Sequence, residues 1–161
     1  MPPTRRYGEL SKHYVSAKPT LCTCQRQALC LLAKQVKLWY YLDMKKDILS
    51  NLSLQLVDLC YNLSKELQSK KEHNFADQIK RSSTSVCANI AEGGHPQSKP
   101  DMISKFEIAL KEAFETDRWL QMLLKVKLIN TDDFNAINKI CTKIRVLLIA
   151  SIKTLKSQIN K

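Results

Sequence analysis

The sequence predicts an all-α protein built as an up-down antiparallel four-helix bundle. From residue 44 onward, apolar residues recur at intervals of three and four in four successive segments, which is the period of an amphipathic helix. The segments are joined by connections of about three to six residues, which favours antiparallel neighbours. The chain of 161 residues holds only 3 Gly and 5 Pro, and no segment alternates with the period of a strand.

The first two helices are expected at about Ser50–Ser69 and Asn74–Glu92. The apolar stripe of the first consists of leucines, namely Leu52, Leu56, Leu59, Leu63 and Leu67. The second mixes apolar and small residues on one face, including Phe75, Ile79, Ser82, Ser83, Val86, Cys87, Ile90 and Ala91. We expect Gly93 and Gly94 to end this helix in a left-handed conformation, and Pro96 prevents its continuation.

The third helix is expected to begin at Ser98 and to extend to Lys127. Ser98 supplies a capping hydroxyl, Pro100 suits the first turn, and Asp101 completes a sequence close to a capping box. The fourth helix is expected from Thr131, where Asp132 and Asp133 lie favourably in the first turn.

Residues 1–43 differ from the rest of the chain. They hold 7 basic and 2 acidic residues, and the stretch 29–42 is apolar on nearly every face. We interpret residues 1–43 as a mis-assigned extension and expect the native product to begin at Met44, with 44–161 forming the bundle. The alternative is an ordered N-terminal helix docked on the bundle.

Composition narrows the cellular setting. The net charge of +11 makes an anionic partner plausible, and no apolar run is long enough to span a bilayer. No signal peptide is visible, so a reducing cytoplasm is expected and disulfides are not.

Cys60, Cys87 and Cys141 fit small buried side chains, and the spacing of Cys22, Cys24 and Cys30 is a weak match to a zinc site. We expect neither a metal nor a cofactor.

No catalytic arrangement emerges from the sequence. His73 and His95 flank the second helix, about 30 Å apart at helical rise, and cannot share a site within one chain. The glycine pair follows a helix rather than a strand, which does not suit a phosphate loop. Glu112 and Glu115 lack the histidines of a di-iron bundle and are expected on a solvated face. These observations favour a protein that is not an enzyme.

Basic residues are the candidate nucleic-acid contacts. The selected set is Lys80, Arg81, Lys105, Lys111, Arg118, Lys125, Lys143 and Arg145. Lys111, Arg118 and Lys125 recur every seven residues and therefore share a face of the third helix. The alternative is a solvated lysine-rich face with no partner. In a symmetric oligomer the field of such a face is multiplied, which favours an RNA or DNA contact.

Asn89 is unusual inside a helix, because its amide competes for backbone hydrogen bonds. We expect its amide to be satisfied against a neighbouring helix, with a subunit or ligand contact as the alternative.

Several segments together resemble a known bacterial family. The stretches are 77–84 (DQIKRSST), 85–93 (SVCANIAEG), 98–113 (SKPDMISKFEIALKEA) and 115–120 (ETDRWL). They resemble four-helix-bundle proteins whose founding members were found in intervening sequences of large-subunit ribosomal RNA genes. The resemblance covers about residues 44–158.

The resemblance implies an up-down bundle that assembles as a ring-shaped pentamer, but it implies no established activity. The accessory variability proteins of diversity-generating retroelements are similar, and they bind a reverse transcriptase and nucleic acid through a basic ring. The motif residues carried over are a signature of fold or assembly, namely Gln78, Arg81, Ser85, Asn89, Glu92 and Gly93.

We therefore predict a non-enzymatic, self-associating helical bundle that binds RNA or an RNA-bound protein through a basic surface. The alternative is a protein-interaction module, such as a reverse-transcriptase accessory or scaffold, with no direct nucleic-acid contact.

Overall fold

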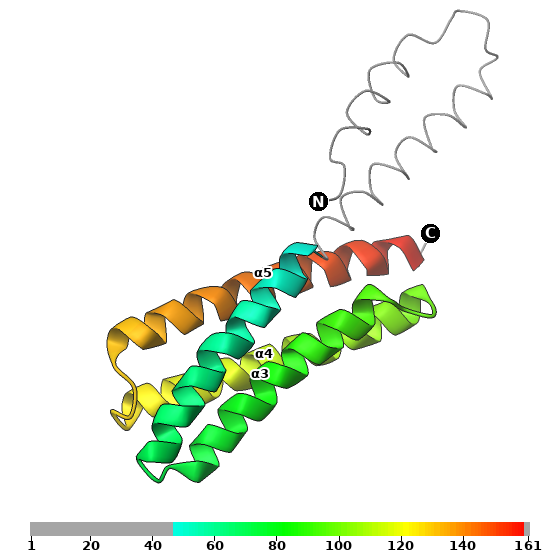
Figure 1. The fold of residues 1–161 in the computed structure, drawn as a ribbon. Helices are drawn as coiled ribbons and strands as arrows, with labels where there is room; N and C mark the ends of the chain where they lie inside the picture. Colours follow the sequence, from blue (N-terminus) through cyan, green and yellow to red (C-terminus); the bar gives the residue numbers. More distant parts are fainter. Residues whose placement is uncertain (1–46, 160–161) are drawn as a thin grey trace, which may run out of the picture. The chain divides into compact units, whose positions relative to one another are not determined.

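The computed structural model describes residues 47–159, which form four helices (Figure 1). The first described helix covers residues 47–69, and α3 (His73–Gly94), α4 (Lys99–Lys125) and α5 (Thr131–Ile159) follow. The predicted four-helix bundle is confirmed. The expectations about residues 1–43 and Met44 lie outside the described residues.

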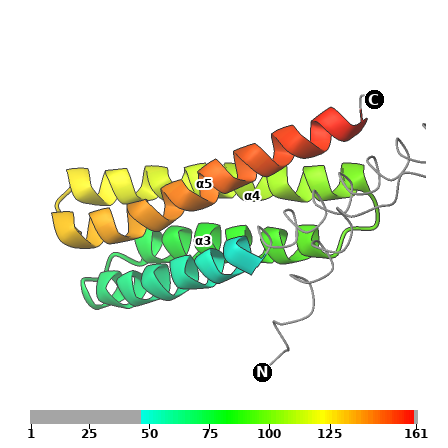
Figure 2. The same ribbon diagram turned by 90° about the horizontal axis from the view of Figure 1, so that it is seen from above.

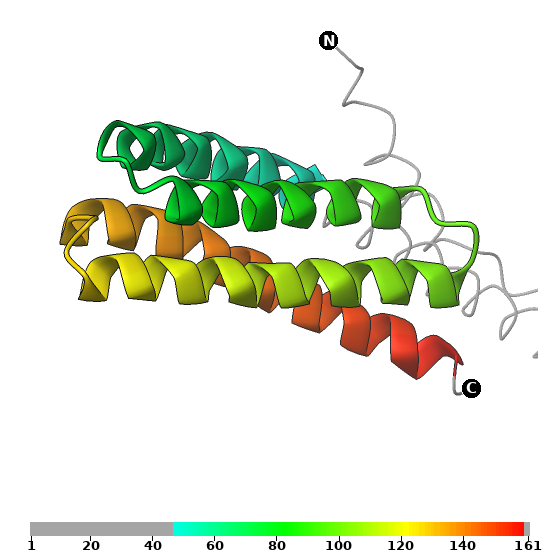
Figure 3. The same cartoon turned by 90° about the horizontal axis from the view of Figure 1, so that it is seen from below.

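The helices run up and down and form two layers (Figures 2 and 3). The 47–69 helix and α3 make one layer, α4 and α5 make the other, and the 47–69 helix lies diagonally across the bundle from α4. The turns after residue 69 and after α4 meet at one end, where the Lys70 ammonium donates to the carbonyl oxygen of Leu128 at 3.1 Å.

The core consists of the apolar stripes expected from the sequence. Each of the four helices contributes fully buried side chains, among them Leu56, Leu67, Ile79, Val86, Phe106, Leu120, Leu123, Ile144 and Leu148. Burial of each such side chain contributes roughly 1.5–3 kcal/mol, which makes these stripes the main stabilising feature of the bundle. Among the described helices, none combines the length and apolar character needed to cross a membrane.

The beginnings of α4 and α5 are capped by side chains. The Ser98 hydroxyl accepts from the backbone N–H of Asp101 at 3.2 Å, so the predicted cap is confirmed. At α5 the Asn130 side-chain oxygen accepts from the backbone N–H of Asp133 at 2.8 Å. The sequence analysis did not identify Asn130, although Asn is a favoured residue at this position.

The predicted left-handed end at Gly93 and Gly94 is wrong. Both glycines belong to α3, and no glycine in the described residues has a positive φ. The left-handed positions are instead Lys71 (φ 65°) and Lys127 (φ 61°), each in the turn that follows a helix. The presence of glycine at position 93 therefore needs a different physical explanation.

That reason is the close approach of α3 to α4. A Cβ atom on Gly93 would lie 2.5 Å from Cε1 and 2.6 Å from Cδ1 of Phe106, whose ring is buried. Small residues continue this contact along α3, where the buried Ser82 hydroxyl accepts from the Thr116 hydroxyl of α4 at 2.9 Å. The two helices approach each other where α3 carries small side chains.

The three described cysteines differ in burial. Cys60 and Cys141 are buried, as predicted, and burial raises the pKa of the Cys60 thiol to about 12 and that of Cys141 to about 11. Cys87 is only half-buried, and its sulfur accepts a 3.5 Å hydrogen bond from Ser53. For Cys87 the expectation of a buried side chain was therefore wrong.

Gly93→Ala should lower the free energy of unfolding by about 1–3 kcal/mol, because the new methyl group overlaps the Phe106 ring. Gly94→Ala is the matched control, since a Cβ there meets nothing within 4 Å. It should leave stability unchanged or raise it by up to about 1 kcal/mol through helix propensity. Urea unfolding followed by circular dichroism measures both, and equal effects of the two variants would contradict the assigned role of Gly93.

Alkylation of the native protein at pH 8 should modify Cys87 well before Cys60 and Cys141. The raised pKa values keep the two buried thiols protonated at this pH, and the thiolate is the reactive form. Peptide mass spectrometry after timed exposure to iodoacetamide resolves the three sites. Similar rates for all three in the native state, with no difference from the urea-unfolded protein, would contradict the burial described here.

Candidate nucleic-acid interface

Three of the predicted basic residues form a row along α4. Lys111, Arg118 and Lys125 are all exposed, and we call them the α4 basic row. Neighbouring members are separated by about 10 Å along the axis at helical rise. Within residues 47–159, none of the three forms an ion pair, and the Arg118 guanidinium donates only to the amide oxygen of Gln121 at 3.2 Å. Their charges are available to an external anion.

Arg81 is paired across the interface between α3 and α4. Its Nη2 lies 3.3 Å from Oε1 of Glu115, which also accepts a hydrogen bond from the Trp119 indole at 3.2 Å. The Trp119 ring meets Phe75 edge-on, with ring centroids 6.0 Å apart. Glu115 was expected on a solvated face, but its side chain is only 36% exposed because Arg81 and Trp119 cover it. The Arg81 side chain itself remains 70% exposed.

Lys105 is also engaged between these helices. Its ammonium group pairs with Glu92 of α3, and the hydrogen bond with that carboxylate raises the pKa of Lys105. Two of the family-motif residues, Arg81 and Glu92, therefore each pair with a residue of α4. Both pairs join α3 to α4.

Among the predicted contacts, Arg145 interacts with several side chains inside the bundle. Its Nη1 lies 2.7 Å from Oδ2 of Asp117, and the two side chains are only 16% and 12% exposed. Arg145 also donates to Thr142 at 2.9 Å, and its guanidinium lies 5.1 Å from the centroid of the Phe114 ring. Asp117 further accepts from Gln121 at 3.2 Å. The guanidinium joins α5 to α4, so we leave Arg145 out of the proposed interface.

The remaining predicted residues lie apart from these. Lys80 on α3 is exposed, and its ammonium lies 5.3 Å from the centroid of the Tyr61 ring. Lys143 on α5 is exposed and has no ion pair within the described part of the chain. The structure thus brings together three of the eight residues as the α4 basic row and holds three others in ion pairs between helices.

Three further motif residues on α3 are only partly exposed. Gln78, Ser85 and Asn89 are half-buried. The Asn89 amide donates to the backbone oxygen of Ser85 at 2.9 Å and to its hydroxyl at 3.4 Å. The expectation that this amide is satisfied against a neighbouring helix is therefore wrong, because Ser85, one turn earlier, already accepts from it.

Residues 47–159 contain two histidines. His73 is the first residue of α3 and His95 follows its last, so they lie at opposite ends of the helix, as predicted, and both are exposed. No group of three or more His, Cys, Asp or Glu side chains in this part of the chain could hold a metal ion.

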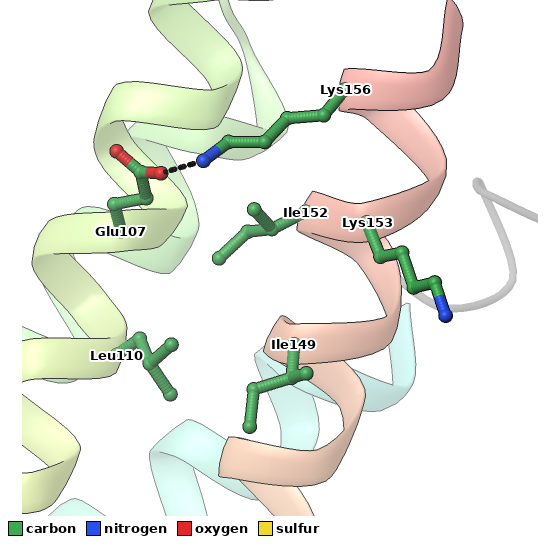
Figure 4. A pocket seen from close by; sticks show the side chains of 6 residues that line it. All are labelled: Glu107, Leu110, Ile149, Ile152, Lys153 and Lys156. Carbon is green, nitrogen blue, oxygen red and sulfur yellow. Dashed lines mark ion pairs between the residues drawn. The ribbon is translucent and has the colours of Figure 1, made fainter.

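The surface between α4 and α5 is partly apolar. An open hollow lies there, lined by Leu110, Ile149 and Ile152, and an ion pair between Glu107 and Lys156 closes one end at 2.7 Å (Figure 4). Ile149 is 49% exposed, and two other large apolar side chains of α4 and α5 are also exposed, Phe114 at 50% and Val146 at 60%. The sequence analysis did not identify this surface, because Phe114, Val146 and Ile149 lie outside the apolar stripes that it followed.

Comparisons with known proteins agree with this architecture. Residues 45–150 match the family model of the 23S rRNA-intervening sequence protein. A crystal structure of a protein of unknown function, from the S23 ribosomal protein family of Bacteroides thetaiotaomicron, is 39% identical and superposes with a TM-score of 0.65. The match covers 68% of this chain and 98% of that chain. Among curated proteins, no match is found.

Arg145→Met should lower the free energy of unfolding by about 2–3 kcal/mol, because it leaves the poorly exposed Asp117 carboxylate without its cationic partner. Arg81→Met is the matched control and should cost less than about 1 kcal/mol, since solvent screens its pair with Glu115. Chemical denaturation of both variants gives the comparison. Equal losses would show that burial does not distinguish the two pairs.

Proposed function

Because the chain belongs to the 23S rRNA-intervening sequence protein family and carries the α4 basic row, we propose that it is a non-enzymatic, self-associating bundle that binds RNA. The observation that carries this proposal is the row itself, in which Lys111, Arg118 and Lys125 have no ion pair within residues 47–159. Cationic side chains at regular spacing suit the phosphates of a nucleic-acid backbone. The family description, which refers to ribosomal RNA, supports RNA as the nucleic acid.

Self-association of the bundle increases its expected affinity for RNA. A single row of three charges binds weakly, whereas repeated rows on one assembly add their fields. The family resemblance implies a ring-shaped pentamer, and the exposed apolar side chains Phe114, Val146 and Ile149 offer surface that a second copy can cover. An RNA-bound protein, such as a reverse transcriptase, is a partner that the same assembly would accommodate.

The apolar surface on α4 and α5 also favours a second candidate function. Exposed large apolar side chains mark protein contacts more often than nucleic-acid contacts. In this candidate the protein is an interaction module or scaffold, and the α4 basic row only keeps the surface solvated. RNA binding and its dependence on salt distinguish the two candidates.

Replacing Lys111, Arg118 and Lys125 together by Glu should weaken RNA binding by at least about tenfold at 100 mM salt. Each lost phosphate contact should also reduce the slope of log affinity against log salt, by roughly 0.7–0.9 per contact over the range from single strands to duplexes. Fluorescence anisotropy with the full chain and a labelled structured RNA, at several salt concentrations, measures both quantities. Light scattering on the same samples reports the oligomeric state.

The matched control places the same change of charge away from α4, at the exposed residues Lys71, Lys139 and Lys153. This triple Glu variant should retain most of the affinity. An equal loss in both triple variants would mean that binding follows net charge rather than the α4 basic row. An oligomer that ignores RNA at low salt would favour the interaction module.

A further inference from the structure

An exposed aromatic ring on the 47–69 helix lies between two ammonium groups from different helices. Tyr61 is 42% exposed, the Lys65 ammonium lies 4.6 Å from its ring centroid, and the Lys80 ammonium of α3 lies 5.3 Å from it. We propose that Tyr61, Lys65 and Lys80 form a contact site for single-stranded nucleic acid, in which a base stacks on the ring and the lysines hold its phosphates. The inference rests on the proposed function and names a second contact region for it.

Helix packing brings these three residues together. Tyr61 and Lys65 are one turn apart, so they share a face of the 47–69 helix. The 47–69 helix contacts α3 through Ser53, whose hydroxyl donates to Cys87 at 3.5 Å, and this contact helps to set the register between the two helices. Lys80 precedes Ser83 on α3 and reaches the same ring.

The charges at this site are unbalanced. Within residues 47–159, neither Lys65 nor Lys80 forms an ion pair, although both ammonium groups lie against one ring. The ring attracts each cation, but the two cations repel each other. A bound phosphate removes this repulsion, and as the ammonium groups turn towards it they free the ring for another partner.

The exposed ring distinguishes nucleic acid from a simple anion. Inorganic phosphate or a polyphosphate chain can use the lysines but gains little from an aromatic face. A nucleobase can stack on that face whatever its sequence, and alternation of aromatic and basic groups is typical of surfaces that bind single strands. A double helix keeps its bases stacked on one another, so the site should prefer single strands.

This site is separate from the α4 basic row. The 47–69 helix, which carries Tyr61 and Lys65, lies diagonally across the bundle from α4 (Figures 2 and 3), and the two regions share no residue. Substitutions in one region can therefore be tested without altering the other.

The test compares Tyr61→Ala, Tyr61→Phe and the double variant Lys65→Gln/Lys80→Gln in the full chain. Anisotropy is measured with a labelled 12-nucleotide single-stranded RNA, with DNA of the same sequence, and with polyphosphate as a competitor that has no bases. Tyr61→Ala should weaken oligonucleotide binding about tenfold and leave polyphosphate binding unchanged, whereas Tyr61→Phe should bind like the parent protein. The lysine variant should weaken binding of all three polyanions and reduce the salt slope for RNA by roughly 1.4.

Ile48→Ala is the matched control, since it removes a large apolar side chain of similar exposure from the same helix, at 45% against 42% for Tyr61. It should bind the oligonucleotides normally. If Tyr61→Ala binds like the parent while the triple Glu variant of the α4 basic row is impaired, the Tyr61 site is overturned and the proposed function stands. If the parent protein binds no RNA at all, both fail. Weaker oligonucleotide binding by Ile48→Ala, equal to that of Tyr61→Ala, would also overturn the Tyr61 site.

Discussion

The close approach of α3 to α4 is the constraint on which the rest of this bundle depends. At Gly93 there is no room for a Cβ atom, because the Phe106 ring occupies that space. At Ser82 a hydroxyl meets the hydroxyl of Thr116, and both side chains are buried. Small side chains at these positions let large ones, such as Phe106 and Leu120, fill the core at native density. The separation of the helices then determines which charged side chains can meet across them.

Ion pairs between helices divide the basic residues into two groups. Arg81, Lys105 and Arg145 each find a carboxylate on the neighbouring helix and contribute to the packing of α4 with α3 or α5. Lys111, Arg118 and Lys125 lie on the outer face of α4, where no described carboxylate pairs with them. Among the predicted contacts within residues 47–159, the basic side chains thus have two physical roles, and the outward ones are available to an anionic partner.

The sequence predicted the helices well because their signals are local. The three- and four-residue period of the leucines in 47–69, the Ser98 cap and the acidic first turn of α5 each depend on residues within one helix. The candidate site was predicted less well. The α4 basic row was identified, since a repeat of seven keeps residues on one face, but the pairing of Arg145 with Asp117 joins residues 28 positions apart. No local pattern indicates which carboxylate a distant arginine will meet.

The sequence by itself determined that this chain forms four amphipathic helices, that short connections make them antiparallel, and that one face of α4 is basic. Hydrophobic periodicity and capping fix these features before any helix meets another. Only the tertiary structure decided that Gly93 serves packing rather than a turn, and that Lys80 of α3 joins Tyr61 of the 47–69 helix. Both depend on the register between neighbouring helices, which the packing of side chains sets.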